Sequence, residues 1–317
     1  MGSCQKLMKT PVALLIFNRP SCTEKVFEAI RQAKPAQLLV IADGPRPDRP
    51  DDIKKCAAAR AVIDRVDWDC EVLKNFSDPN LGCGVRPVTG ISWVFEHVDR
   101  AIILEDDCIP HPDFFRFCDE LLERYRDDES VMHISGNNFW SRKYQHEDSY
   151  LFSCYTLSWG WATWRRAWQH YDFDMKYWLQ MTQENQKKLL KDLLKDEHAA
   201  KTWLKIFQDV VEMNLDCWDY QWTLACWLQS GLTIVPHVNL VSNVGFDTDA
   251  THTFSANTNS VDCPQFSIPT AAMNFPLKHP QLVARNFQVE RFIQDICYDY
   301  FPKLLKRIRL KLNRIFS

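Results

Sequence analysis

The sequence predicts an α/β protein with a mainly parallel, doubly wound sheet. Short apolar runs alternate with helix-like stretches through the first half of the chain, a pattern typical of βαβ units. From residue 150 onward the composition shifts to tryptophan-rich stretches, which indicates a helical second half packed on the sheet. No linker separates the halves, so we expect one domain over residues 1–290, with halves at 10–140 and 150–260.

The expected strands are short apolar runs that end at turn residues. They are residues 12–17, 38–42, 71–76, 101–104 and 131–135, and an extended run at 232–244 closes the domain. Helices are expected at 23–33, at about 52–66, in a stretch ending near residue 97, and at 112–125. In the second half, Trp161, Trp164 and Trp168 recur at helical spacing, which predicts a helix with an aromatic core stripe.

Composition excludes several classes of protein. A hydrophobic content of 46% is enough for one large core, and a net charge of -3 gives no field that attracts nucleic acid. No apolar run is long enough to span a membrane, and no secretory signal precedes the 12 cysteines. We therefore expect reduced, buried thiols in a cytoplasmic protein, and the absence of any C-x-x-C pair argues against structural zinc.

Polar residues follow several of the expected strands where those strands end. Arg19 follows the first strand, Asp43 the second, and Glu105, Asp106 and Asp107 the fourth. Parallel strands would bring these residues to one rim, where open α/β sheets bind ligands. Consecutive acids after a buried strand are costly unless neutralised, and Mg²⁺ or Mn²⁺ would neutralise them while leaving positions for substrate phosphates. The alternative is that Asp106 or Asp107 only caps the following helix.

The segment around these acids resembles a known family. Residues 102–115 read IILEDDCIPHPDFF, which resembles the strand, Glu-Asp-Asp motif and helix start of N-acetylglucosaminyltransferase I and its relatives. Arg19, Asp43 and residues 131–138 match the same family in order and spacing. The resemblance implies the GT-A (nucleotide-diphospho-sugar transferase) fold.

Bacterial family 2-like glycosyltransferases look similar over nearly the whole chain. The similar stretches include WGWATW at 159–164 and ATHT at 250–253. This resemblance implies that residues 10–140 are the nucleotide-binding half and residues 150–260 the acceptor half.

The resemblance also implies roles for individual residues. Asp107 matches the metal ligand of the family, and Glu105 and Asp106 match residues that contact the nucleoside or support the metal site. Arg19 and Asp43 match the positions that hold uracil and ribose, where a carboxylate is a suitable acceptor for the uracil N3–H. Without the resemblance, Asp43 would be an ordinary turn residue.

An inverting transferase needs a general base for the acceptor hydroxyl. The family has an Asp in a Trp-Asp-Asp-Trp block, and this chain has WDYQW at 218–222, in which one acid remains and the spacing differs by one residue. Asp219 is therefore the predicted base, with Asp216 as the fallback. The alternative for Asp219 is a helix N-cap.

Three further residues have a candidate role and a simpler alternative. Trp159, expected at the mouth of a helix, is a candidate for packing against the donor sugar. His252 matches a late histidine that reaches the metal or diphosphate in several GT-A enzymes, or is a solvated loop histidine. Arg86 either reaches phosphate oxygens or is an ordinary surface arginine.

The C-terminal segment, residues 291–317, is predicted to be a basic amphipathic helix. Apolar residues fall on one face, lysine and arginine occupy much of the rest, and no acid follows Asp299. Such a helix binds an anionic membrane surface, docks on its own domain, or binds a partner.

Together these features predict a metal-dependent glycosyltransferase that uses Mn²⁺ or Mg²⁺. The donor would be a nucleotide sugar, with UDP favoured, and the product a hexosyl or N-acetylhexosaminyl glycan or glycolipid of bacterial polysaccharide or cell-surface assembly. We expect a cytoplasmic enzyme, peripheral at the inner face of the membrane. The alternatives are a nucleotidyltransferase, although the chain lacks a glycine-rich, basic loop after its first strand, and a non-catalytic carbohydrate- or lipid-binding protein of the same fold.

Overall fold

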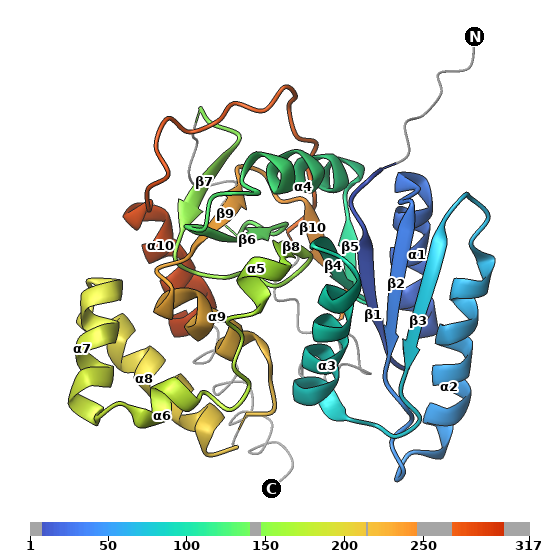
Figure 1. Cartoon of the computed structure of the whole chain (residues 1–317), viewed down its shortest axis with the longest axis horizontal. Coiled ribbons are helices and arrows are strands. Elements are labelled where there is room, and N and C mark those ends of the chain that lie inside the picture. The colour runs from blue at the N-terminus through green and yellow to red at the C-terminus, as the bar shows by residue number, and fades with distance from the viewer. Residues whose placement is uncertain (1–7, 140–146, 214, 246–267, 301–317) are drawn as a thin grey trace, which may run out of the picture.

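The computed structural model describes residues 8–139, 147–213, 215–245 and 268–300. Within this part of the chain, eight strands form one sheet in the order β3-β2-β1-β4-β8-β6-β9-β7, and β5 pairs with β10 in a small second sheet (Figure 1). The strands are β1 (Val12–Ile16), β2 (Gln37–Ala42), β3 (Glu71–Phe76), β4 (Arg100–Glu105), β5 (Cys108–Pro110), β6 (Val131–Ser135), β7 (Tyr150–Ser153), β8 (Trp161–Trp164), β9 (Leu232–Pro236) and β10 (Val241–Asn243).

The large sheet is mainly parallel. Strands β3, β2, β1 and β4 are parallel neighbours, and β6 is parallel to β9. Strand β8 lies antiparallel between β4 and β6, and β7 pairs antiparallel with β9. The predicted α/β class with a mainly parallel sheet is confirmed, and this arrangement is consistent with the expected GT-A fold.

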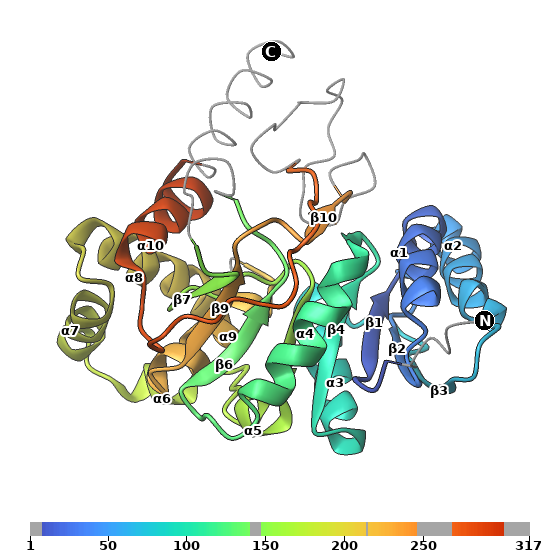
Figure 2. The same ribbon diagram turned by 90° about the horizontal axis from the view of Figure 1, so that it is seen from above.

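Helices cover both faces of the sheet because its strands are apolar on both sides. In β1, Val12 and Leu14 face one core, whereas Ala13 and Leu15 face the other. Helices α1 and α2 lie on the first face and α3 on the second (Figure 2). The helices of this half are α1 (Pro20–Ala33), α2 (Pro50–Ala61) with the 3₁₀ turn Val62–Arg65, α3 (Gly82–His97) and α4 (Pro112–Arg124).

The second half adds a helical layer with its own core. Leu190, Trp203, Phe207 and Trp227 are fully or almost fully buried in this core. Helix α9 joins the layers, because Trp222 packs under the sheet while Trp227 packs among the helices. The helices of this half are α5 (Arg165–Trp168), α6 (Lys176–Gln180), α7 (Gln183–Leu194), α8 (Glu197–Val211), α9 (Asp219–Leu228) and α10 (Phe287–Ile293), followed by the π-helical turn Gln294–Tyr300.

One predicted element is wrong. Trp161 and Trp164 lie on strand β8 rather than on a helix, and only Trp168 belongs to the short helix α5. Trp161 packs in the core under α3 and α9, whereas Trp164 packs in the opposite core. The tryptophans are core residues, as expected, but they belong to different faces of the sheet.

Several expectations concern residues that the structure does not describe. His252, most of the polar stretch after residue 245, and residues 301–317 of the C-terminal segment lie outside the described residues. The ten cysteines within the described part are unpaired. Among the helices that the structure describes, none is both long and apolar enough to cross a bilayer.

Candidate active site

The polar residues that follow β1, β2 and β4 lie at one edge of the sheet. These strands are parallel neighbours in the order β2-β1-β4, so their carboxyl ends point the same way. Figure 1 shows the connections from β2 to α2 and from β3 to α3 at the lower edge of the sheet. The predicted rim is therefore present, and Asp43, Arg19 and the acids after β4 all follow strands that end there.

Arg19 joins the first strand to the acidic triplet. Its Nη1 donates to Asp107 Oδ2 at 2.9 Å and its Nη2 donates to Asp106 Oδ1. The backbone N–H of Phe17 donates to Asp106 Oδ2 at 3.2 Å. The side chains of Asp106 and Asp107 are only 3% and 11% exposed, so this ion pair offsets much of the cost of burying two acids.

Glu105 differs from its two neighbours because nothing neutralises it directly. No hydrogen bond or salt bridge reaches its half-buried side chain from any residue that the structure describes. Burial, with the negative charges of Asp107 and Asp106, raises the pKa of Glu105 to about 8, although Arg19 opposes the rise. A carboxylate in this position favours either a proton or a cation.

The alternative that the triplet only caps the next helix does not hold. The N-cap of α4 is His111, whose side chain accepts from the backbone N–H of Asp113. Asp106 and Asp107, which follow β4, instead form ion pairs with Arg19, which follows the neighbouring strand β1.

A late segment, not expected at this site, lies against Asp107. Asn243 at the end of β10 donates from Nδ2 to Asp107 Oδ1 at 3.4 Å, and the N–H of Val244 donates to the Asp107 carbonyl at 2.9 Å. A Cβ on Gly245 would overlap Asp107 Oδ2 and lie 3.0 Å from Arg19 Nη1. In the sequence, the only indication of this contact is a glycine that follows an extended run, and the sequence does not show that its neighbour is Asp107.

Asp43 organises the loop that leads into α3. Its Oδ1 accepts from the N–H groups of Gly44 and Leu81, each at 2.9 Å. Its Oδ2 accepts from Asn80 Nδ2 at 2.9 Å and from the N–H of Gly82 at 3.1 Å. A carboxylate has about four acceptor positions, so a uracil N3–H could bind only by displacing one of these donors.

Asp219 reaches the same region from the acceptor half. It is the first residue of α9, whose N-cap is Trp218, so Asp219 is not itself the N-cap. Its negative charge adds to the raised pKa of Glu105, but less than burial and the charges of Asp107 and Asp106 do. Tyr171, which sequence reasoning missed, donates from its hydroxyl to the Trp218 carbonyl at 3.0 Å and so supports the start of this helix.

Asp216, the fallback base, sits at the start of α3. Cys83 Sγ lies 3.1 Å from Asp216 Oδ2. The carboxylate packs so closely on the helix that a Cβ on Gly84 would overlap Asp216 Oδ1, and one on Gly82 would lie 3.2 Å from Oδ2. Asp216 therefore connects the two halves of the protein.

Trp159 and Arg86 have defined packing. Trp159 is half-buried, with its ring 5.2 Å from that of Phe139 in an edge-to-face arrangement. Arg86 is buried, not a surface arginine; its Nε donates to the Ala42 carbonyl at 3.2 Å and its Nη2 to Asn75 Oδ1 at 2.8 Å. Arg86 thus ties the ends of β2 and β3 together.

Carboxylate oxygens are the ligands that hard divalent cations such as Mg²⁺ and Mn²⁺ prefer. Within the described part of the chain, no three His, Cys, Asp or Glu side chains form a metal-binding group. Magnesium and manganese sites that handle substrate phosphates need only one or two protein carboxylates. Two carboxylates of this kind, Glu105 and Asp107, lie at the end of β4, and Asp107 also accepts from Arg19 and Asn243.

Comparisons with known proteins found structural neighbours, two of which are described here. No family model matches the chain, and no curated protein matches it in sequence. A mannosyltransferase from Pyrobaculum calidifontis, solved with GDP-Man and Mn²⁺, aligns with a TM-score of 0.35 and 12% identity, over 74% of this chain and 58% of the mannosyltransferase. A UDP-glucose pyrophosphorylase solved with UDP-glucose aligns with a TM-score of 0.30 and 9% identity, over 51% of this chain and 79% of the pyrophosphorylase. The fold assignment therefore follows from the strand order itself.

Proposed function

We propose that this protein is a glycosyltransferase that moves a sugar from a nucleotide sugar to an acceptor hydroxyl. The observation that carries the proposal is the meeting of two groups at one edge of the sheet. The acids after β4 come from one half of the chain. The segment that leads to Asp219 comes from the other half and packs on the start of α3, where Asp216 Oδ2 lies 3.1 Å from Cys83 Sγ. A donor held by the first group would present its sugar to an acceptor beside the second.

The donor would lie across Arg19, Asp43 and the acidic triplet, with UDP as its nucleotide. Glu105 and Asp107 would hold Mn²⁺ or Mg²⁺, with His252 as a further ligand. A bound cation would supply a positive charge for the leaving diphosphate. Asp106, paired with Arg19, would support Asp107, and Trp159 would pack against the donor sugar.

Asp219 would take the proton from the acceptor hydroxyl, which gives inversion at the anomeric carbon. The acceptor would be a glycan or a lipid-linked saccharide in polysaccharide assembly at the inner face of the membrane. The basic segment 301–317 would contact anionic lipid there.

The first test is calorimetric titration of UDP with and without Mn²⁺. Wild-type protein should bind UDP in a metal-dependent manner, and Asp107→Ala should weaken that binding by at least about tenfold because a metal ligand is lost. Asp64→Ala, which removes an exposed acid paired with Lys74, is the control for loss of charge and should bind as wild type. Binding that ignores both metal and Asp107 would contradict the proposed metal site.

The second test separates transfer from binding. Asp219→Asn should keep UDP affinity but lower the rate of UDP release from a UDP-sugar by about 100- to 10,000-fold, the usual contribution of a general base. A wild-type protein that binds UDP-sugars but releases no UDP with any acceptor would be a non-catalytic binder. Formation of diphosphate from UTP and a sugar phosphate would instead identify a nucleotidyltransferase.

A further inference from the structure

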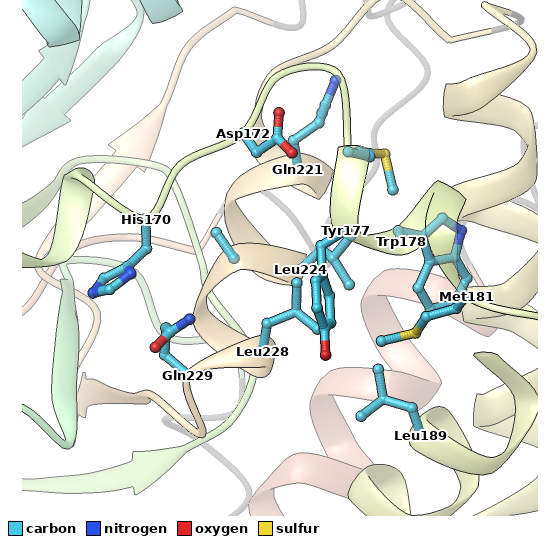
Figure 3. A pocket seen from close by; sticks show the side chains of 12 residues that line it. His170, Asp172, Tyr177, Trp178, Met181, Leu189, Gln221, Leu224, Leu228 and Gln229 are labelled. Atoms are coloured by element: carbon cyan, nitrogen blue, oxygen red, sulfur yellow. The ribbon is translucent and has the colours of Figure 1, made fainter. Parts of the chain in front are cut away.

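A cavity of about 520 Å³ lies in the acceptor half, beside α9 (Figure 3). It is bounded by α6, α7 and the turn between α5 and α6. Helix α9 contributes a stripe of residues spaced three or four apart, namely Gln221, Leu224, Ala225, Leu228 and Gln229. The volume falls within the range of about 300–1,000 Å³ that is usual for small-molecule sites.

This cavity is separate from the candidate active site. No residue assigned above to the donor site or to proton transfer lines it. On α9, Gln221 follows Asp219 by two residues, so the two side chains leave the helix about 200° apart. The lining contains Asp172 but no lysine or arginine, which disfavours the diphosphate of a nucleotide sugar.

The lining of the cavity combines buried apolar residues with one exposed tyrosine. Trp178 is 3% exposed and lines the cavity with Met175 and Leu224. Tyr177, the neighbouring residue on α6, is 60% exposed and lines the same cavity. An exposed tyrosine combines a flat apolar face with a hydroxyl that can form hydrogen bonds.

Polar side chains also line the cavity. Figure 3 places His170 and Gln229 at one end of the view and Asp172 with Gln221 at another. The side chains of His170 and Gln229 are exposed and make no hydrogen bond or ion pair with any part of the chain that is described. Gln221 is held in place by a hydrogen bond from Nε2 to the Cys217 carbonyl at 3.0 Å.

We propose that this cavity binds an uncharged saccharide. A sugar ring presents an apolar C–H face for Tyr177 and hydroxyl groups for His170 and Gln229, whereas a lipid chain offers these two side chains no hydrogen bond. Asp172 already accepts from the N–H groups of Asp174 and Lys176, at 3.2 Å and 2.6 Å. The inference rests on the proposed function and extends it. The saccharide is the part of a glycan acceptor that lies away from the reacting hydroxyl, so the acceptor is an oligosaccharide or polysaccharide rather than a single sugar.

The test is saturation-transfer NMR with four neutral hexasaccharides, namely maltohexaose, cellohexaose, chitohexaose and mannohexaose. At least one should bind the full-length protein, and Tyr177→Ala should weaken its binding at least about tenfold through loss of the aromatic face. Leu179→Ala is the matched control, because Leu179 is 55% exposed on the same helix but does not line the cavity. It should bind as wild type.

Three results would overturn the inference. The first is that no hexasaccharide binds at millimolar concentration, and the second is that Tyr177→Ala binds as tightly as wild type. The third is that dodecanol displaces the bound sugar and its alkyl chain occupies the cavity instead. UDP binding with Mn²⁺ is measured on the same samples and should be unchanged in Tyr177→Ala. Wild-type protein that binds UDP but none of the hexasaccharides would therefore contradict the cavity assignment. Absence of UDP binding in wild type contradicts the proposed function.

Discussion

At the scale of single residues, the buried His133 forms hydrogen bonds through both of its ring nitrogens. Trp222 donates from Nε1 to His133 Nδ1 at 3.1 Å, and His133 Nε2 lies 3.1 Å from the Leu157 carbonyl. An indole N–H only donates and a carbonyl only accepts, so the proton of this neutral imidazole sits on Nε2. Burial lowers the pKa of His133 to about 3.

This histidine predicts a dependence of stability on pH. The unfolded chain binds a proton on His133 near pH 6.5, whereas the folded protein does so only near pH 3, so the free energy of unfolding falls as pH drops between these values. Between pH 6.5 and 5 this group alone should account for about 2 kcal/mol. Denaturant titrations at pH 6.5 and pH 5 measure the free energy of unfolding, and the difference between the two values should be smaller by that amount in His133→Gln. The control variant His170→Gln, at an exposed position, should leave this difference in free energy unchanged. The same difference in wild type and in His133→Gln would contradict the assignment.

At the scale of elements, the predictable and unpredictable parts of the fold have different physical causes. Strands β1 to β4 could be predicted because each apolar run ends in a turn. Strand β8 could not, because both faces of the sheet are buried there and Trp161 and Trp164 hide the alternation that marks a strand. Its aromatic residues also match a helical spacing.

The loop between β3 and α3 gives a second prediction. Asp43→Asn keeps one acceptor oxygen but replaces the other with a donor, which leaves the Asn80 amide and the Gly82 N–H facing an NH₂ group. The ligand-free variant should lose about 1–3 kcal/mol of stability. Chemical denaturation measures this loss without any nucleotide. Weaker UDP binding at unchanged stability would instead assign Asp43 to the nucleobase.

For the whole molecule, the candidate site depends on contacts between distant parts of the chain. The rim of the sheet was predictable from parallel strands, but the pairing of Arg19 with Asp106 and Asp107, the approach of Gly245 and the seat of Asp216 on α3 were not. Hydrophobic periodicity indicates which face of a helix or strand is buried, but it does not indicate which other segment packs against that face. The two halves of the chain meet through such contacts between distant residues, for example Asp216 with the start of α3.

The contact between Asp216 and the start of α3 gives a prediction about catalysis. A Cβ at position 84 would overlap Asp216 Oδ1 and lie only 3.3 Å from the Cys217 carbonyl oxygen, so Gly84→Ala should shift the backbone of the segment between α8 and α9 that leads to Asp219. A displacement of about 1 Å would lower kcat by about 100-fold while UDP binding with Mn²⁺ stays within error. Steady-state kinetics beside calorimetry distinguishes the two effects. Val85→Ala, at a partly exposed neighbouring position, is the control, and a parallel loss of UDP affinity in Gly84→Ala would contradict this account.

Because of the same contact, the reactivity of the Cys83 thiol depends on whether Asp216 is bound to α3. Burial and the adjacent Asp216 carboxylate raise the pKa of its thiol to about 12, so almost none of it is thiolate at neutral pH while the contact is intact. Separation of Asp216 from α3 would expose the thiol and remove the negative charge beside it. The alkylation rate of this one cysteine would then report how often the two halves come apart, in the native chain and without an attached label.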